Sequence, residues 1–279
     1  HPSAPGLGLA LGSGGAKGFA HIVVLEALDE LGLAPCAISG SSVGALAGAL
    51  YAAGMSGKEI RTFLLKRLAD RFGVARDLMA CGAGGLADLF TFAGNPILVD
   101  ARKVMERFLP AGMPTRFEDL ALPLSVVATD YYAKREMAFA AGELLPALAA
   151  SVSIPGLFRP VEHGGSLLID GGATNPLPFD HLTERAGVVV AVDVTGGPSE
   201  DDRARGVPAP LDVLFAAVQI LTHAVITEKL ARARPAVVLR PDVARFRTLD
   251  FFAAPAILEA ADPIKDDLKR ALDQLLREA

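Results

Sequence analysis

The feature that most constrains this chain is a glycine-flanked turn between a short apolar strand and an Ala/Leu-rich helix. The strand is expected at Cys36–Ser39, and the helix ends at Gly54. Between them Ser42 is flanked by Gly40 and Gly44 in a Gly-x-Ser-x-Gly pattern. At a sharp strand-to-helix turn the central serine projects from a strained backbone, and side chains two positions away would collide with the neighbouring elements. The following helix directs its positive end at the hydroxyl. The pattern favours a nucleophilic serine, whereas the alternative is a tight turn without chemistry.

The composition narrows the class of protein and its partners. The chain has 279 residues, 51% of them hydrophobic, which suffices for one large core, so we expect a single domain over residues 1–279. The net charge is −5 and no Lys/Arg run is present. Nucleic acid is therefore not an expected partner. Strong electrostatic docking on anionic lipid is not expected either.

Cysteine content and hydropathy bear on the compartment. Cys36 and Cys81 do not make a disulfide framework, and Cys36 is expected to be a small buried residue within its strand. The apolar region 144–158 is interrupted by two prolines and is too short to span a membrane. No signal peptide is recognisable. We expect a cytoplasmic protein, with peripheral attachment to a membrane as the alternative.

The chain opens with a strand, a glycine loop and a helix. Residues 7–11 are apolar throughout, as in a buried parallel strand, and residues 12–18 form the loop. Apolar residues at helical spacing follow from 20 to 31. Together with the strand and helix around Ser42, this order implies a right-handed β-α-β unit with both loops at the same edge of the sheet.

The first loop has three interpretations. It differs from a dinucleotide fingerprint because the six-residue frame ending at Gly18 begins with Ser13, and no acidic residue ends the second strand. Backbone N–H groups of Gly14, Gly15 and Ala16 can instead stabilise an oxyanion beside a nucleophile on the adjacent loop. Phosphate binding and a plain tight turn are the alternatives.

The remaining pattern is that of an α/β fold. Helices are expected after the capping box that starts at Ser56, after Asp100, after Gly142, and at 211–230 and 264–276. Strands are expected at 122–129, 136–140, 166–169, 187–194 and 236–239. Helix 211–230 is apolar nearly all round in its first half and is therefore expected to be buried.

Two segments leave alternatives open. Residues 79–99 are irregular and glycine-rich, and we expect a core-packed connector, with a mobile lid or lipid-contacting flap as the alternative. Phe246, Phe251 and Phe252 lie in a Pro-flanked loop, where core packing is favoured over a substrate wall.

A nucleophilic serine needs a proton acceptor. Asp170 ends a strand and is followed by Gly171 and Gly172, which allow the backbone to turn tightly and approach another loop. Its ordinary pKa is about 3.9, so burial has to raise that pKa before it becomes an effective base. An Asx-turn role is the alternative for Asp170, and Asp130 and Asp193 are rival acids.

Histidines are weaker candidates for the base. Beyond Ser42 the chain has His163, His181 and His223. His181 precedes Leu182 in an expected helix and His223 lies inside an apolar helix, which are not settings for a late catalytic histidine. We expect structural roles for each, with a His-containing esterase triad as an alternative.

Three separated motifs resemble those of the bacterial patatin-like phospholipases. Residues 14–18, which include Lys17 and Gly18, resemble the glycine-rich oxyanion loop of that family; residues 40–44 resemble its nucleophile elbow; residues 170–172 resemble its Asp-Gly-Gly motif. The resemblance covers about residues 7–195, and the expected helical part at 210–279 carries no family motif.

The resemblance implies a fold and an activity. The implied fold is a three-layer α/β/α arrangement with a mostly parallel central sheet. The implied chemistry is a Ser42–Asp170 dyad without histidine, metal or cofactor. Lys17 would brace the oxyanion loop or add positive charge to it.

The function expected on these grounds is a lipid acyl hydrolase, a phospholipase, lysophospholipase or esterase working through an acyl-enzyme on Ser42. Its partner is a lipid or acyl-ester substrate, with transient contact at a membrane surface. The alternative is a non-catalytic regulatory or acyl-ligand-binding protein on the same scaffold.

Overall fold

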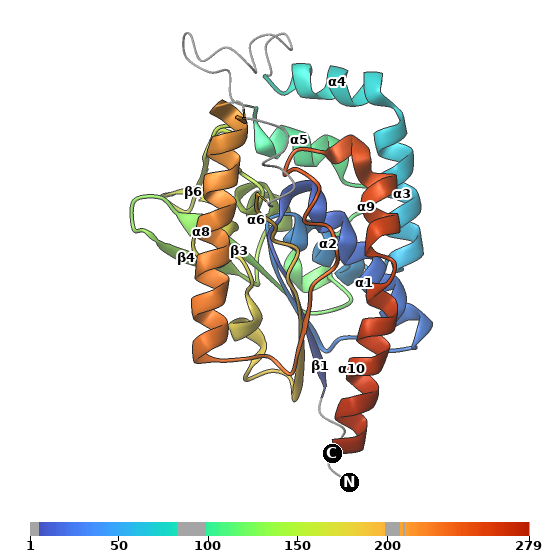
Figure 1. Cartoon of the computed structure of the whole chain (residues 1–279). Helices are drawn as coiled ribbons and strands as arrows, with labels where there is room; N and C mark the ends of the chain where they lie inside the picture. The colour runs from blue at the N-terminus through green and yellow to red at the C-terminus, as the bar shows by residue number, and fades with distance from the viewer. Residues whose placement is uncertain (1–5, 83–98, 199–206, 209, 279) are drawn as a thin grey trace.

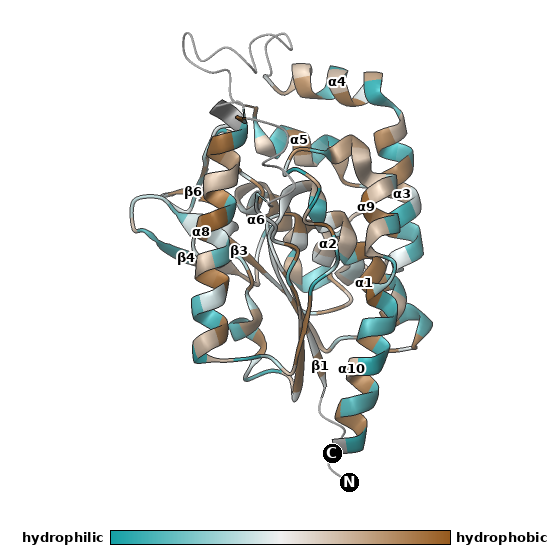
Figure 2. Cartoon of the chain, viewed as in Figure 1, coloured by the Kyte–Doolittle hydropathy of each residue, from teal (hydrophilic) through white to brown (hydrophobic). Residues whose placement is uncertain are grey.

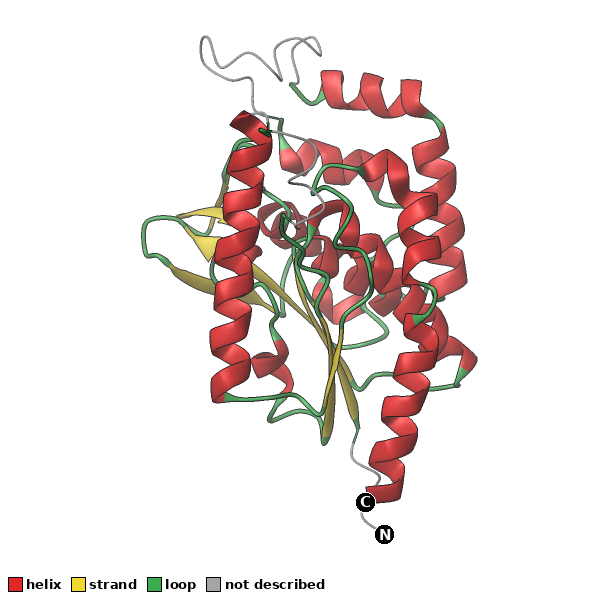
Figure 3. Cartoon of the chain, viewed as in Figure 1, coloured by secondary structure: helices red, strands yellow, loops and turns green. Residues whose placement is uncertain are grey.

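A computed structural model describes residues 6–82, 99–198, 207–208 and 210–278. These residues form an eight-stranded mixed sheet with helices on both faces (Figure 1 and Figure 3). The predicted layered α/β class is confirmed, and four of the seven strand pairs among the described residues are parallel.

The sheet combines a parallel half with an antiparallel half. Parallel pairs join β1 to β2 and β7, β2 to β3, and β7 to β8, whereas β3–β4, β3–β6 and β5–β6 are antiparallel. The strands are β1 (Leu7–Leu11), β2 (Ala37–Ser41), β3 (Leu124–Asp130), β4 (Arg135–Phe139), β5 (Val161–His163), β6 (Ser166–Asp170), β7 (Val188–Val192) and β8 (Val237–Leu239).

Strand β3 brings two distant loops together. Strand β4 pairs with β3 over Val126–Asp130 and so occupies one edge of that stretch. On the other edge, β2 ends with Ser41 opposite Val127, and β6 ends with Asp170 opposite Ala128. Because a strand has only two edges, β2 and β6 lie end to end along the same edge of β3. The residues that follow Ser41 therefore meet Asp170.

Helices cover both faces of the sheet. They are α1 (Ala20–Glu30), α2 (Val43–Ala52), α3 (Gly57–Ala69), α4 (Arg71–Ala80), α5 (Ala101–Phe108), α6 (Leu144–Ser151), α8 (Pro210–Arg232), α9 (Ala254–Ala261) and α10 (Ile264–Glu278), with short 3₁₀ turns η1 (Gly15–Phe19), η2 (Phe117–Asp119), η3 (Gly171–Ala173), η4 (Phe179–Leu182) and η5 (Phe251–Ala253). Because side chains alternate along a strand, Leu9 of β1 joins a core with α1, α2, α9 and α10, whereas Ala10 joins a second core with η4 and the end of α8.

Helix α8 departs from its prediction. Figure 2 shows that the first half of α8 is largely apolar. Val213 (50% exposed), Ile220 (55%) and Leu221 (67%) nevertheless lie on the surface, so the expectation that its first half is buried is wrong. The helix joins the core through Ile226 and Leu230 in its second half. An apolar composition cannot by itself distinguish a buried helix from one whose apolar side has no protein neighbour.

Two further predictions need correction. Cys36 is exposed rather than buried, because β2 starts at Ala37 and Cys36 belongs to the connection before it. Helix α4, within the segment that precedes the glycine-rich region, was not predicted. Most of segment 79–99, the candidate lid, lies outside the described residues.

Other local predictions hold. The capping box is present, with the Ser56 side chain accepting from Glu59 and the Glu59 side chain accepting from the Ser56 N–H. Phe246 and Phe251 pack against the large core, as expected, whereas Phe252 is 46% exposed.

Candidate active site

Ser42 occupies the tight turn between β2 and α2. Its backbone has φ 56° and ψ −128°, a conformation that non-glycine residues rarely adopt. A Cβ at Gly44 would lie 2.2 Å from the Leu11 carbonyl oxygen, and one at Gly40 would lie 2.5 Å from the Ala45 Cα. Both glycines are therefore required for the close approach of β1 and α2 to the turn. The strained backbone projects the serine side chain from the end of the sheet.

Ser42 and Asp170 are in direct contact. The Ser42 hydroxyl donates to Asp170 Oδ2 at 2.6 Å, and the Gly172 N–H donates to Asp170 Oδ1 at 2.7 Å. Asp170 is buried, and this burial raises the pKa of its carboxyl to about 6, against the opposing effect of the two hydrogen bonds. A Cβ at Gly171 would lie 2.2 Å from the Val127 carbonyl oxygen, so only glycine allows this turn to pack on β3. The carboxylate is thus held and oriented beside the hydroxyl.

The rival acids have other partners. Asp130 accepts hydrogen bonds from the N–H groups of Tyr132 and Ala133 and from the Ser166 hydroxyl, and these bonds lower its pKa. Asp193 pairs with Arg240 at 3.1 Å. Neither carboxylate contacts Ser42 in the described part of the chain.

The histidines also have other roles. His181 pairs with Glu136 at 3.3 Å, His223 is exposed on α8, and the ring of His163 packs against Phe139. His21 is buried, and burial lowers its pKa to about 4, so it is neutral when its ring contacts the Gly12 carbonyl oxygen at 2.8 Å. The geometry therefore offers no histidine to Ser42 among the described residues.

The glycine loop after β1 offers two backbone donors. Within the described ranges the N–H groups of Gly14 and Gly15 have no hydrogen-bond acceptor, and both residues line the cavity that holds Ser42. The Ala16 N–H donates to the Thr248 carbonyl oxygen at 2.8 Å, so the prediction of Ala16 as a third oxyanion donor is corrected. Gly15 has φ +59°, and a Cβ there would lie 2.4 Å from the same carbonyl oxygen. Thr248 thus fixes the loop that presents the two free donors.

Ser151 is a supporting residue that the sequence did not identify as such. Its hydroxyl accepts from the Ser42 N–H at 2.8 Å and donates to the Val127 carbonyl oxygen at 2.6 Å. This chain of bonds ties the strained turn to β3. Ser151 lies in α6, far from Ser42 in sequence, and no local sequence pattern identifies a serine for this role.

Lys17 is a buried cation at the wall of the site. Its side chain is fully buried, and its Nζ has no hydrogen-bond partner among the described residues. Burial lowers the pKa of Lys17 to about 8, and the charge of Asp250 partly offsets the effect. The ammonium therefore adds positive charge to the cavity that contains Ser42 and does not brace the loop by hydrogen bonding.

Replacing Lys17 with methionine should stabilise the folded protein at pH 7. A folded-state pKa of about 8 against an ordinary 10.5 means that protonation of the folded protein costs up to about 3 kcal/mol. Since the folded pKa is lowered, the wild type gains stability as pH rises from 8 towards 10.5, and the advantage of the variant should disappear over that window. Urea unfolding of both proteins at pH 7 and pH 10 measures the difference. If the wild type and Lys17→Met have equal free energies of unfolding at both pH values, the predicted cost of burying the Lys17 charge is wrong.

These groups surround one cavity of about 230 Å³. Its polar side carries Ser42, Asp170, Gly14, Gly15 and Lys17. Its apolar side comes largely from α8, through Phe215, Val218, Leu221 and Val225. The sequence did not predict this wall, because nothing local places α8 over the end of the sheet. The arrangement can hold an apolar chain beside a serine hydroxyl, a carboxylate and two free backbone N–H groups.

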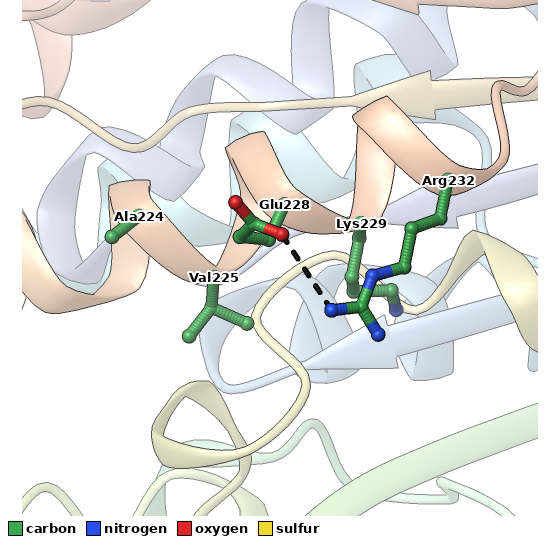
Figure 4. Close-up of a pocket in the computed structure, with 5 residues that line it drawn as sticks. All are labelled: Ala224, Val225, Glu228, Lys229 and Arg232. Carbon is green, nitrogen blue, oxygen red and sulfur yellow. Dashed lines mark ion pairs between the residues drawn. The ribbon is translucent and has the colours of Figure 1, made fainter.

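A second hollow lies along the end of α8 and lacks such chemistry. It is lined by Ala224, Val225, Glu228, Lys229 and Arg232, and Glu228 and Arg232 pair at 3.6 Å (Figure 4). None of these five residues is a serine, threonine or cysteine, so nothing in the described lining competes with Ser42.

Among the residues that the structure describes, one side-chain cluster has metal-ligand composition. Oxygen and nitrogen atoms of Glu136, Asp180 and His181 lie within 4.8 Å of one another. The Lys229 ammonium already donates to Asp180 Oδ1 at 2.6 Å and contacts the Phe179 ring. A lysine therefore supplies the positive charge that a metal ion would bring.

The part of the chain that carries these residues matches a known family. Residues 9–183 match the sequence profile described as patatin-like phospholipase. The chain belongs to the patatin-like phospholipase family. The matched residues include Ser42, Asp170 and the glycine loop, whereas α8 lies outside them.

Relatives in this family include longer proteins. An uncharacterized NTE family protein of Mycobacterium tuberculosis is 36% identical over 203 residues, which cover 71% of this chain and 52% of that protein. Lysophospholipase NTE1 of Mycosarcoma maydis is 31% identical over 206 residues, covering 72% of this chain and 10% of that protein. The chain thus spans about half the length of the mycobacterial relatives.

Two solved structures are similar in outline. VipD from Legionella pneumophila has a TM-score of 0.46 and 16% identity, covering 95% of this chain and 67% of its own. The type III effector protein ExoU has a TM-score of 0.42 and 16% identity, covering 97% of this chain and 54% of its own.

Proposed function

We propose that this chain is a lipid acyl hydrolase that cleaves carboxylic esters through an acyl-enzyme on Ser42, with Asp170 as the general base. The observation that carries the proposal is the 2.6 Å contact between the Ser42 hydroxyl and Asp170. Membership of the patatin-like phospholipase family and similarity to a lysophospholipase support a lipid ester as substrate.

The proposed acylation step transfers one proton. Ser42 Oγ bonds to the ester carbonyl carbon while its proton moves to Asp170 Oδ2. The carbonyl oxygen becomes an oxyanion, and the N–H groups of Gly14 and Gly15 stabilise it. When the tetrahedral intermediate collapses, the bond to the leaving alcohol breaks and that alcohol takes the proton from Asp170.

Deacylation repeats the sequence with water. Asp170 accepts a proton from a water molecule as its oxygen attacks the acyl carbon. Ser42 then leaves, regains its proton from Asp170, and a fatty acid is released. The positive charge of Lys17 favours the oxyanion in both steps, because charge interactions are stronger in a cavity with little water.

The test is turnover across p-nitrophenyl esters of increasing chain length and across phospholipids and lysophospholipids. Release of fatty acid by the wild type, lost in Ser42→Ala, supports the proposal. Tight binding of acyl ligands without turnover of any ester would favour a non-catalytic protein on the same scaffold.

The pH dependence of hydrolysis should have an acid limb near pH 6. Asp170 acts as a base only when ionised, and its pKa is raised to about 6 by burial. Below that pH, kcat/KM should fall about tenfold per pH unit as the carboxyl becomes protonated. The profile is measured with a soluble p-nitrophenyl ester. His181→Gln should keep the same limb; a limb that disappears in that variant would assign the titration to the histidine.

A further inference from the structure

The first half of α8 carries two adjacent apolar stripes. One of them, with Val218 and Leu221, lines the cavity that holds Ser42. The next stripe, with Val213 and Ile220, does not line the cavity and is about half exposed, at 50% and 55%. Ala217 and Ala224 continue this outer stripe at spacings of three and four residues and are also exposed. The apolar residues of α8 that line the cavity therefore adjoin an exposed apolar stripe on the same helix.

This face has little charge. No charged residue occurs between Val213 and Thr222. At the start of the helix, Asp212 Oδ2 lies 3.5 Å from Arg247 Nη1, so the two charges neutralise each other. A partner that binds this face has to be recognised by apolar contact and not by charge.

The second half of α8 is fixed to the protein. Ile226 and Leu230 are buried, and the Lys229 ammonium donates to the Leu177 carbonyl oxygen at 3.1 Å and to Asp180 at 2.6 Å. By length and composition Asp212–Arg232 is the one helix in the described ranges that meets the criteria for a membrane span. A helix packed on a sheet along its second half cannot cross hydrocarbon, but its free half can lie at the surface of a bilayer.

The wall that the face shares with the cavity identifies the occupant of the face. A lipid whose ester lies at Ser42 needs an apolar path for its acyl chain between the cavity and the bilayer. An apolar face that adjoins the cavity wall provides that path. A second copy on the same face would cover Leu221, which is 67% exposed at the cavity wall.

We propose that the face formed by Val213, Ala217, Ile220 and Ala224 docks on the surface of a lipid bilayer. The adjoining stripe with Val218 and Leu221 then guides one acyl chain from the bilayer to Ser42. This inference rests on the proposed hydrolase function, since it states that the enzyme takes its lipid substrate from a bilayer and not from solution.

The test compares two double variants on vesicles of neutral phosphatidylcholine. Val213→Glu/Ile220→Glu places two charges on the proposed face without touching the cavity wall. Its partition onto vesicles should fall about tenfold or more, because two half-exposed apolar side chains no longer enter the bilayer. Hydrolysis of vesicle lipid should fall in parallel, whereas hydrolysis of soluble p-nitrophenyl butyrate should not change. Wild-type partition should be insensitive to salt, since charge contributes little.

The matched control is Leu33→Glu/Leu276→Glu. These two leucines are 40% and 78% exposed and lie beside α1 and on α10, on the opposite side of the sheet from α8. The control adds the same charge, and it should bind vesicles as the wild type does. Equal thermal stability of the two double variants shows that both are folded.

Different results separate the two proposals. If both double variants partition equally while the soluble ester is hydrolysed, the docking face is refuted and the hydrolase function stands. If the wild type hydrolyses no ester yet partitions onto vesicles through α8, the docking face stands and the hydrolase function fails. If Val213→Glu/Ile220→Glu dissociates a dimer and leaves partition unchanged, the face joins two copies and the proposal is overturned.

Discussion

Ser42→Ala should reduce hydrolysis of a soluble ester by about 10⁴-fold or more, because removal of a serine nucleophile leaves only binding and oxyanion stabilisation. The same variant should lose covalent labelling by a fluorophosphonate, which reports the nucleophile independently of the substrate chosen. The backbone at this turn should persist, since alanine keeps the Cβ and the backbone N–H at position 42 still donates to Ser151.

The neighbouring serine provides a matched control. Ser41 is buried, and within the described residues its hydroxyl has no hydrogen-bond partner. Ser41→Ala should therefore keep turnover and labelling close to those of the wild type. Labelling that persists in Ser42→Ala, or that is lost in Ser41→Ala, would remove Ser42 from the nucleophilic role.

The sequence contains strong local signals for the turns that carry Ser42 and Asp170. Glycines on either side of Ser42 and after Asp170 are required where the backbone passes within van der Waals contact of another strand, and such requirements remain visible in the sequence. The contact between Ser42 and Asp170, in contrast, has no local signal in the sequence. It depends on β2 and β6 ending along the same edge of β3, and the register of strands far apart in sequence has no local signature.

The errors share a physical origin. Ala16 lost its predicted role because its N–H is taken by Thr248, and no local rule places that carbonyl beside the loop. The exposure of α8 was not predicted because an apolar composition does not indicate whether another part of the protein covers the helix. Ser151 is recognisable only once α6 is packed against β3. Each of these depends on tertiary contacts.

Asp170→Asn should separate activity from stability. The amide keeps the shape of the side chain and can still accept from the Gly172 N–H, but it cannot take a proton from Ser42. Loss of a general base lowers turnover by about 10³-fold, within the range seen for such groups. Turnover is measured with a soluble ester at pH 8. Near-normal turnover would bring Asp130 or a histidine back as the base.

The same substitution should make the folded protein more stable at pH 8. The folded-state pKa of Asp170 is about 6 against an ordinary 3.8, so ionising this buried carboxyl costs up to about 3 kcal/mol of folding free energy. Because the folded pKa is raised, the wild type loses this stability as pH rises from 3.8 through 6. The Asp170→Asn variant carries no such cost, so its advantage in urea unfolding should be largest at pH 8 and should shrink at pH 5.

Asp130→Asn is the matched control, and its effect on stability should have the opposite sign. Hydrogen bonds from Ala133, Ser166 and Tyr132 lower the pKa of Asp130, so its ionised form stabilises the fold. At pH 8, Asp130→Asn should therefore be less stable than the wild type while keeping turnover. If both variants shift stability in the same direction, the cost assigned to Asp170 is not specific to its burial beside Ser42. If the signs differ and only Asp170→Asn loses turnover, the charge that destabilises the fold is the one that the proposed reaction needs.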